Sequence, residues 1–211
     1  MPPKLFLLFA ALTCGLFMAG CLSQQEVDKL NGRFMSRDSR LVQTTVDEMA
    51  AHDDERFVEM AAAYLQEAEE VRGTPPLPGP VEARVAGAIR LLVQCDPKQA
   101  RQMLERALAA EPSPSFRLPR WSLRLASALN SPEVWERLCQ LYRADVLRHY
   151  ERYDIGKVLL RAGNDQFLND VRVLARKPDK LSVGFLARSA TPEDIDILLW
   201  CLQNAPVYQA Q

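Results

Sequence analysis

The segment "GAIRLLVQCDPKQARQMLERAL", residues 87–108, contains two apolar helical patterns on either side of Asp96-Pro97. An aspartate just before a helix accepts a hydrogen bond from an unsatisfied N–H group of the first turn. Proline suits the first helical position because no N–H group is needed there. The segment therefore predicts a helix over 81–95, a tight turn, and a second helix over 97–110.

The same kind of helix start recurs along the chain. After Asp96, the next two capping residues follow at intervals of 35 and 33 residues. A period of this size that holds two helices is typical of stacked helical hairpins. Apolar residues also stand at offsets 4, 7 and 11 from each cap, which after the last cap are Ile195, Leu198 and Leu202. The five caps are Asp53, Asp96, Ser131, Asn164 and Thr191, and the prolines at first helical positions are Pro97, Pro132 and Pro192.

Residues 87–108 resemble a HEAT-type repeat, in which an apolar first helix and an Asp-Pro turn precede a second helix. Ala100-Arg101 stands where that repeat usually carries Val-Arg. Residues 126–142 and 159–175 echo the pattern less closely, because neither has the arginine at the matching place. The resemblance implies a HEAT-like α-solenoid or a compact α–α bundle, and TPR-like hairpins remain an alternative.

No segment shows the alternation of a β-strand, so we predict an all-α protein. An N-terminal helical hairpin is expected over 36–72, a Pro-rich linker over 73–80, and the HEAT-like repeat domain over 81–205. The linker, "GTPPLPGP", contains four prolines that oppose helix formation. Individual helices are predicted over 36–51, 54–72, 81–95, 97–110, 118–129, 132–143, 145–162, 165–177, 179–190 and 192–205.

The N-terminus reads as a targeting signal. Lys4 precedes an uncharged apolar run that is shorter than the roughly 20 residues of a membrane span. The residues Met18-Ala19-Gly20-Cys21 resemble the lipobox of bacterial lipoproteins, whereas Cys14 lies inside the apolar run. The resemblance implies a signal peptide over 1–20, acylation including palmitate on Cys21, and an anchor and tether over 21–35. The alternative is an ordinary secretory peptide.

The resemblance also bears on the location in the cell. Leu22 follows Cys21. An acidic residue at this place retains many such proteins in the inner membrane. The leucine therefore implies a lipid-anchored protein of the cell envelope, at the outer membrane and facing the periplasm.

Charge and cysteine content limit the classes of function. The formal net charge is −1, which is not typical of a nucleic-acid-binding protein. Carboxylates dominate residues 22–71, whereas residues 113–162 hold eight arginines and Lys157. We expect Cys139 and Cys201 to be buried small hydrophobes, because both lie within apolar helical patterns, and one disulfide between two of Cys95, Cys139 and Cys201 stays open.

The sequence offers little for catalysis. His52 and His149 lie far apart and lack metal-ligand spacing, so we expect no metal site and no cofactor. His52 is expected at a helix C-terminus and His149 on a helix surface. Ser122 and Ser127 lack the glycines of a nucleophile elbow. We therefore do not expect an enzyme.

The best candidate for a binding surface is the basic and aromatic middle of the chain. Arginine and aromatic residues are enriched at binding hot spots. On the helix predicted over 145–162, Arg148 and Arg152 would point the same way, with Tyr150 in the core stripe. The alternative is that the aromatic residues belong to the core and the arginines cover them. The candidate partner-binding residues are Arg120, Trp121, Arg124, Arg148 and Arg152.

These observations predict a membrane-anchored envelope lipoprotein that acts as a protein-binding scaffold or adaptor, with an envelope protein as its partner. One alternative is a pilotin-like lipoprotein that targets or assembles an outer-membrane component. A second alternative, of a different class, is a periplasmic hydrolase whose site is not recognisable in the sequence.

Overall fold

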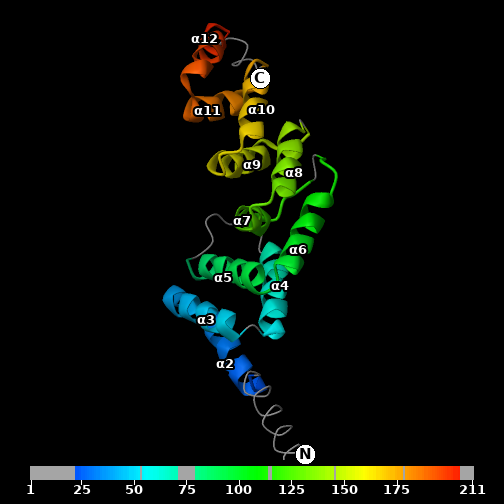
Figure 1. Cartoon of the computed structure of the whole chain (residues 1–211), viewed down its shortest axis with the longest axis vertical. Coiled ribbons are helices and arrows are strands. Elements are labelled where there is room, and N and C mark those ends of the chain that lie inside the picture. Colours follow the sequence, from blue (N-terminus) through cyan, green and yellow to red (C-terminus); the bar gives the residue numbers. More distant parts are fainter. Residues whose placement is uncertain are drawn as a thin grey trace, which may run out of the picture. The chain divides into compact units, whose positions relative to one another are not determined.

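The computed structural model describes residues 22–52, 54–70, 79–113, 116–144, 146–177 and 179–204 (Figure 1). These ranges form eleven α-helices and one 3-10 turn, and they contain no β-strand. The prediction of an all-α protein is confirmed. The predicted signal peptide, Cys21, the cap Asp53 and most of the Pro-rich linker lie outside the described residues.

The chain divides into two compact units between Ala100 and Arg101. We call them unit 1 and unit 2 and describe each by itself. The division falls within helix α6 (Pro97–Ala109), not at the predicted linker.

Unit 1 is built around helix α5, against which α3 and α4 both pack, while α2 packs against α3. Its core consists of fully buried apolar side chains from all four helices, among them Phe34, Met49, Leu65 and Leu91. The helices of unit 1 are α2 (Gln24–Phe34), α3 (Ser39–His52), α4 (Glu55–Glu70) and α5 (Gly79–Cys95).

Helix α2 overturns the prediction of a tether over residues 21–35. Ser23 caps this helix: its hydroxyl oxygen accepts a bond from the backbone N–H of Glu26, and the Glu26 carboxylate accepts one from the backbone N–H of Ser23. Val27, Leu30 and Phe34 recur at helical spacing on one face and are buried. This segment is therefore part of the folded body, not a connection to it.

The start of α5 also differs from the expected linker. Gly79 and Pro80 form its first turn, where proline lacks only an N–H group that the helix does not use. Further along, α5 approaches α3 so closely that a Cβ atom on Gly87 would lie 2.6 Å from Cγ2 of Val46. A larger residue at this position would push the two helices apart.

The described part of unit 2 contains six α-helices and the 3-10 turn η1 besides the rest of α6, and its central pairs are α8 with α9, α9 with α11, and α10 with α11. Four aromatic rings form the middle of its core: Tyr142 contacts Phe167 and Phe185 edge-on, and Tyr153 stacks on Phe185. The elements are α7 (Arg120–Leu129), α8 (Pro132–Arg143), α9 (His149–Arg161), α10 (Asp165–Ala175), α11 (Lys180–Ser189), η1 (Pro192–Asp194) and α12 (Ile195–Gln203).

Three of the predicted caps are confirmed by their hydrogen bonds. The side chain of Asp96 accepts a bond from the N–H of Gln99 at 2.9 Å, and that of Asn164 from the N–H of Phe167 at 2.8 Å. Ser131 also caps its helix, through a longer bond of 3.4 Å from the next turn. These short local motifs fixed the starts of α6, α8 and α10.

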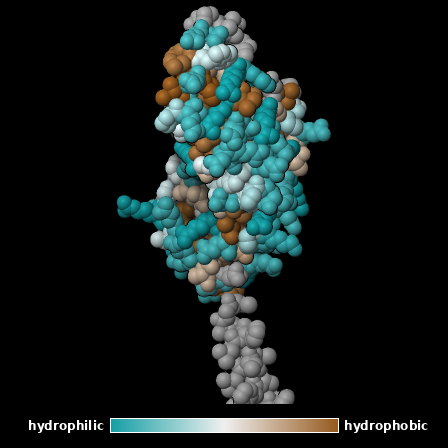
Figure 2. Space-filling view, turned by 45° about the horizontal axis from the view of Figure 1, so that its top comes forward, coloured by the Kyte–Doolittle hydropathy of each residue, from teal (hydrophilic) through white to brown (hydrophobic). Residues whose placement is uncertain are grey.

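The last predicted cap leads to a different structure. Thr191 precedes the 3-10 turn η1, so α12 begins only at Ile195. The tighter turn changes which side chains face inward, and Ile197 and Cys201 are buried instead of the predicted stripe. Ile195 and Leu202 are 52% and 71% exposed. Figure 2 shows a group of hydrophobic residues exposed in the upper part of the view.

Candidate functional site

The five predicted binding residues have different environments within unit 2. Trp121 is only 6% exposed and Arg152 only 8%, so both belong to the interior. Arg120, Arg124 and Arg148 are exposed. The alternative interpretation, in which the aromatic residues belong to the core, is correct for Trp121, whereas the burial of Arg152 was not predicted.

The expectation that Arg148 and Arg152 share an exposed helix face is wrong. Helix α9 begins at His149, and Arg148 is its N-cap in extended backbone conformation. The chain before it forms a turn that buries Leu147, which delays the helix. Tyr150, expected in the core stripe, is consequently 50% exposed.

Arg152 joins three elements of unit 2. Its Nε donates a hydrogen bond to the backbone carbonyl of Tyr142 at 2.9 Å, and its guanidinium lies over the Tyr142 ring at 5.0 Å. Its terminal nitrogens donate to both carboxylate oxygens of Asp179, at 3.0 and 3.4 Å. Such a two-pronged contact satisfies both charges inside the fold. Arg152 is therefore a structural residue.

A serine and an aspartate meet in the same network, but not as a catalytic pair. The Ser182 hydroxyl donates to Asp179 and contacts the Tyr142 hydroxyl at 2.9 Å. Ser182 is fully buried, and Asp179 already neutralises Arg152. Burial raises the pKa of Tyr142 to about 12, so its phenol stays protonated at neutral pH. The arrangement holds helices together and presents no accessible nucleophile.

The basic surface that remains open lies between α9 and α11. A hollow of about 280 Å³ there, which we call the α9–α11 pocket, has apolar and basic residues in its wall and no carboxylate among them. His149 and Tyr153 come from α9, and all other lining residues come from α11. The lining residues are His149, Tyr153, Lys180, Leu181, Gly184, Phe185 and Arg188.

Two cations lie near the aromatic ring of Tyr153: Arg188, which lines the pocket, and Lys157, which lies outside its lining and pairs with Asp154 at 3.9 Å. The Arg188 guanidinium donates a hydrogen bond to the Tyr153 hydroxyl at 3.4 Å and lies 5.9 Å from the ring centroid. The Lys157 ammonium lies 5.3 Å from the same centroid. The hydrogen bond from Arg188, together with its charge, lowers the pKa of Tyr153. The pocket is thus a positively charged hollow with an aromatic wall.

None of the five predicted binding residues lines this pocket, and its α11 side holds a pattern that was not among the predictions. Lys180, Gly184 and Arg188 recur every four residues, so they lie along one face of a helix. A Cβ atom on Gly184 would meet nothing within 4 Å, which places open space between the two cations. The spacing was visible in the sequence, but the pairing of α11 with α9 was not.

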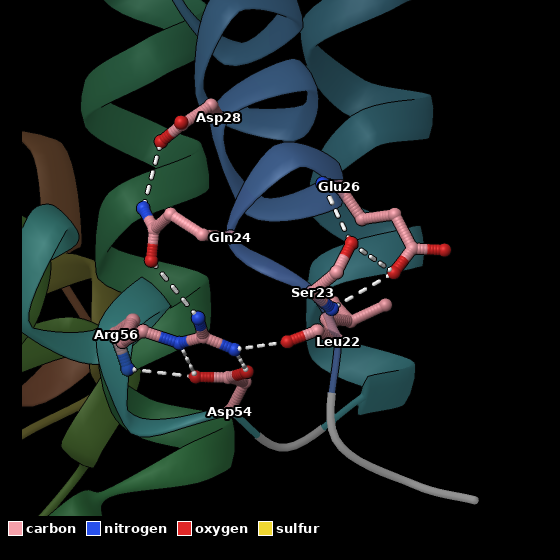
Figure 3. Close-up of polar contacts among 7 residues, drawn as sticks. All are labelled: Leu22, Ser23, Gln24, Glu26, Asp28, Asp54 and Arg56. Carbon is pink, nitrogen blue, oxygen red and sulfur yellow. Dashed lines mark hydrogen bonds and ion pairs between the residues drawn. The ribbon is translucent and has the colours of Figure 1, made fainter.

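A second polar site holds the first described residues of the chain (Figure 3). Arg56, in the first turn of α4, donates to the Leu22 carbonyl at 2.8 Å and to the Gln24 side-chain oxygen at 3.2 Å. The same guanidinium pairs with Asp54 at 2.6 Å, and this contact lowers the pKa of Asp54. We call Leu22, Gln24, Asp54 and Arg56 the N-terminal clamp. It fixes the backbone immediately after residue 21.

The remaining candidate groups have ordinary roles in the described residues. His52 ends α3 and His149 is exposed at the start of α9, both as expected. Cys139 and Cys201 are buried, and burial raises the pKa of the Cys139 thiol to about 11. No group of three or more potential ligands that could hold a metal ion occurs in the described ranges.

None of the described helices combines the length and the apolar character that crossing a bilayer requires. No family model matches the chain, and no curated protein or solved structure shows significant similarity to it.

Proposed function

We propose that the protein is a bacterial envelope lipoprotein, acylated on Cys21, that acts as a scaffold or adaptor for another envelope protein. Its helical pairs would serve as a HEAT-like framework. We expect the protein to be located at the outer membrane, facing the periplasm. The observation that carries the binding role is the α9–α11 pocket, which is lined by cations and lacks a neutralising carboxylate.

The contrast between two arginines supports a binding role over catalysis. The charge of Arg152 is used inside the fold, by Asp179 and by the Tyr142 carbonyl. Arg188 instead lies at an open hollow, where it contacts a neutral phenol. A cation with no carboxylate beside it among the residues that line the pocket is suited to recognise an anionic group on a partner.

The N-terminal clamp gives the proposed anchor a specific consequence. Because Arg56 holds the Leu22 carbonyl, an acyl group on Cys21 would be separated from the folded body by about one residue, or about 3.5 Å of chain. The body would then stay near the membrane surface. Such confinement raises the effective concentration of partners in the same membrane.

The lipid anchor is tested by metabolic labelling with an alkyne analogue of palmitate. We expect the wild type and Cys14→Ser to be labelled and to sediment with membranes, and Cys21→Ser to lose the label. Cys14→Ser is the matched control, because it removes the other N-terminal cysteine, which lies inside the apolar run and outside the lipobox. A label that survives in Cys21→Ser would contradict the assignment of the anchor.

The adaptor role is tested by cross-linking the full-length protein in membranes, purifying it and identifying the attached proteins by mass spectrometry. The variants are Lys180→Gln and Arg188→Gln, with Arg161→Gln as the control, since Arg161 is an exposed arginine of α9 outside the pocket. We expect one dominant partner that is lost in both pocket variants and kept in the control. A partner that is retained in the pocket variants would place the binding surface elsewhere.

A further inference from the structure

We infer that the α9–α11 pocket binds an acidic side chain, a glutamate or aspartate with an apolar neighbour, presented by a segment of the partner protein. This inference rests on the proposed function only in that the ligand belongs to a protein. It requires neither the lipid anchor nor the cellular location to be correct.

The positions of the cations define where a carboxylate would lie. Lys180 and Arg188 stand one turn to either side of Gly184 on the same face of α11. Gly184 leaves the space between them empty. A carboxylate that enters this space is within reach of an ammonium group on one side and a guanidinium on the other. The glycine therefore makes room for the ligand, and the cations supply its charge complement.

The hydrogen bonding of Arg188 favours an incoming carboxylate. Its bond to the Tyr153 hydroxyl is 3.4 Å long, well beyond the usual length of about 2.9 Å. A carboxylate offers two charged oxygens in a geometry that matches the guanidinium fork, and such bonds are about twice as strong as neutral ones. Exchange of the phenol for a carboxylate thus strengthens the bonding of Arg188.

The rest of the wall fits an apolar neighbour of the acidic group. Tyr153 stacks on Phe185 with ring centroids 5.7 Å apart, and Leu181 continues the apolar surface. The hollow of about 280 Å³ lies just below the range of ligand pockets for small molecules, which begin at about 300 Å³. It accommodates one or two side chains. A flat layer of lipid headgroups would not fill a hollow, so a projecting side chain is the better match.

The binding test uses the purified full-length protein in neutral detergent micelles and two fluorescent peptides. The first peptide is Glu-Glu-Leu-Glu-Glu-Phe, and the second carries glutamine at each glutamate position. Fluorescence anisotropy measures both affinities at low and at high salt. We expect the acidic peptide to bind with an affinity that falls at high salt, because its charges are screened. Its affinity should exceed that of the amide peptide by about tenfold or more.

Two kinds of variants separate charge from shape. Arg188→Gln removes one cation and is expected to lower the affinity for the acidic peptide by about tenfold. Gly184→Phe leaves every charge in place but fills the hollow, and we expect it to abolish binding. The matched control is Gly32→Phe in α2, where a Cβ atom also meets nothing within 4 Å. Circular dichroism checks that each variant keeps its helix content.

The outcomes distinguish this inference from the proposed function. Equal binding of the two peptides, or binding unaffected by both Arg188→Gln and Gly184→Phe, would overturn the pocket assignment. Binding of phosphatidylglycerol vesicles that Gly184→Phe abolishes, without binding of the acidic peptide, would also overturn it and indicate a headgroup ligand. If the wild-type protein is not labelled by the palmitate analogue but still binds the acidic peptide, only the proposed anchor is overturned.

Discussion

Unit 2 contains two arginine–tyrosine pairs that differ in what completes them. Arg152 lies over Tyr142 with the Asp179 carboxylate beside it, and all three groups are removed from solvent to a large extent. Arg188 lies near Tyr153 in an open hollow whose wall has no carboxylate. The same two residue types therefore stabilise the fold in one place and line the proposed binding surface in the other. What separates the two roles is whether the chain supplies the counter-charge.

The largest effect is expected from breaking the buried pair. Arg152→Met leaves the carboxylate of Asp179 without its partner, and the loss of one member of a buried ion pair costs about 3 kcal/mol or more. Arg188→Gln, the equivalent change at the open pair, should change the free energy of unfolding by less than about 0.5 kcal/mol. Urea denaturation followed by tryptophan fluorescence measures both. Equal losses in the two variants would remove the distinction between the pairs.

A second neutralised arginine gives a prediction for acid stability. The hydrogen bond from Arg172 lowers the pKa of Asp194 to about 2, whereas an aspartate in an unfolded chain titrates near about 3.9. The ionised Asp194 therefore stabilises the folded protein by about 2 kcal/mol. This contribution is present above the pKa of the aspartate in the unfolded chain, and it is lost as the pH falls through the pKa of Asp194 in the folded protein. The stability difference between wild type and Asp194→Asn should therefore shrink in acid. A difference that is constant between neutral pH and the acid limit of folding would contradict the prediction.

Helices α9 and α11 each contain a glycine at which the same change, to alanine, should have a different effect. A Cβ atom on Gly156 would lie 2.5 Å from Cε2 of Phe185, a ring that other aromatic residues hold in place. Gly156→Ala should destabilise the protein by about 1–2 kcal/mol through overpacking. Gly184→Ala, on the facing helix, should be neutral or stabilising by up to about 1 kcal/mol, since alanine favours helix. Thermal denaturation of the two variants gives the comparison directly.

The smallest effect concerns the two tyrosines. The pKa of Tyr142 is raised to about 12 by burial, whereas that of Tyr153 is lowered by Arg188. Phenolate forms at Tyr153 as the pH rises through its lowered pKa, and this negative charge repels an acidic ligand. Affinity for the acidic peptide should therefore fall a few-fold as the pH rises through the lowered pKa of Tyr153 in the wild type but not in Tyr153→Phe. Parallel loss in both proteins would assign the pH dependence to another group.

Local signals in the sequence were sufficient for most helices but not for the site. The side chains of Asp96, Ser131 and Asn164 cap helices as expected, because a cap depends only on the next few residues. The Ser23–Glu26 capping box is just as local, yet it lies in the segment predicted to be a tether, residues 21–35.

The environment of a side chain depends on packing that a single sequence does not contain. Arg152 is buried because Asp179, far along the chain, lies beside it, and because α9 starts after Arg148. The pocket requires that α11 lie against α9, which no motif predicted. Helix α12 starts late because Pro192–Asp194 form a 3-10 turn. An N-cap followed by proline does not by itself show whether the next residues form a 3-10 turn or an α-helix.

The N-terminal clamp also determines how the body would respond to a mechanical pull. Tension applied at residue 21 enters α2 along the covalent chain and enters α4 at the same time, through the bond from Arg56 to the Leu22 carbonyl. The load is thus shared between two helices from the first residue onward, and it does not peel α2 away one turn at a time. Forced unfolding from this end should begin with rupture of the guanidinium contacts, so Arg56→Ala should lower the first rupture force measured in a single-molecule experiment.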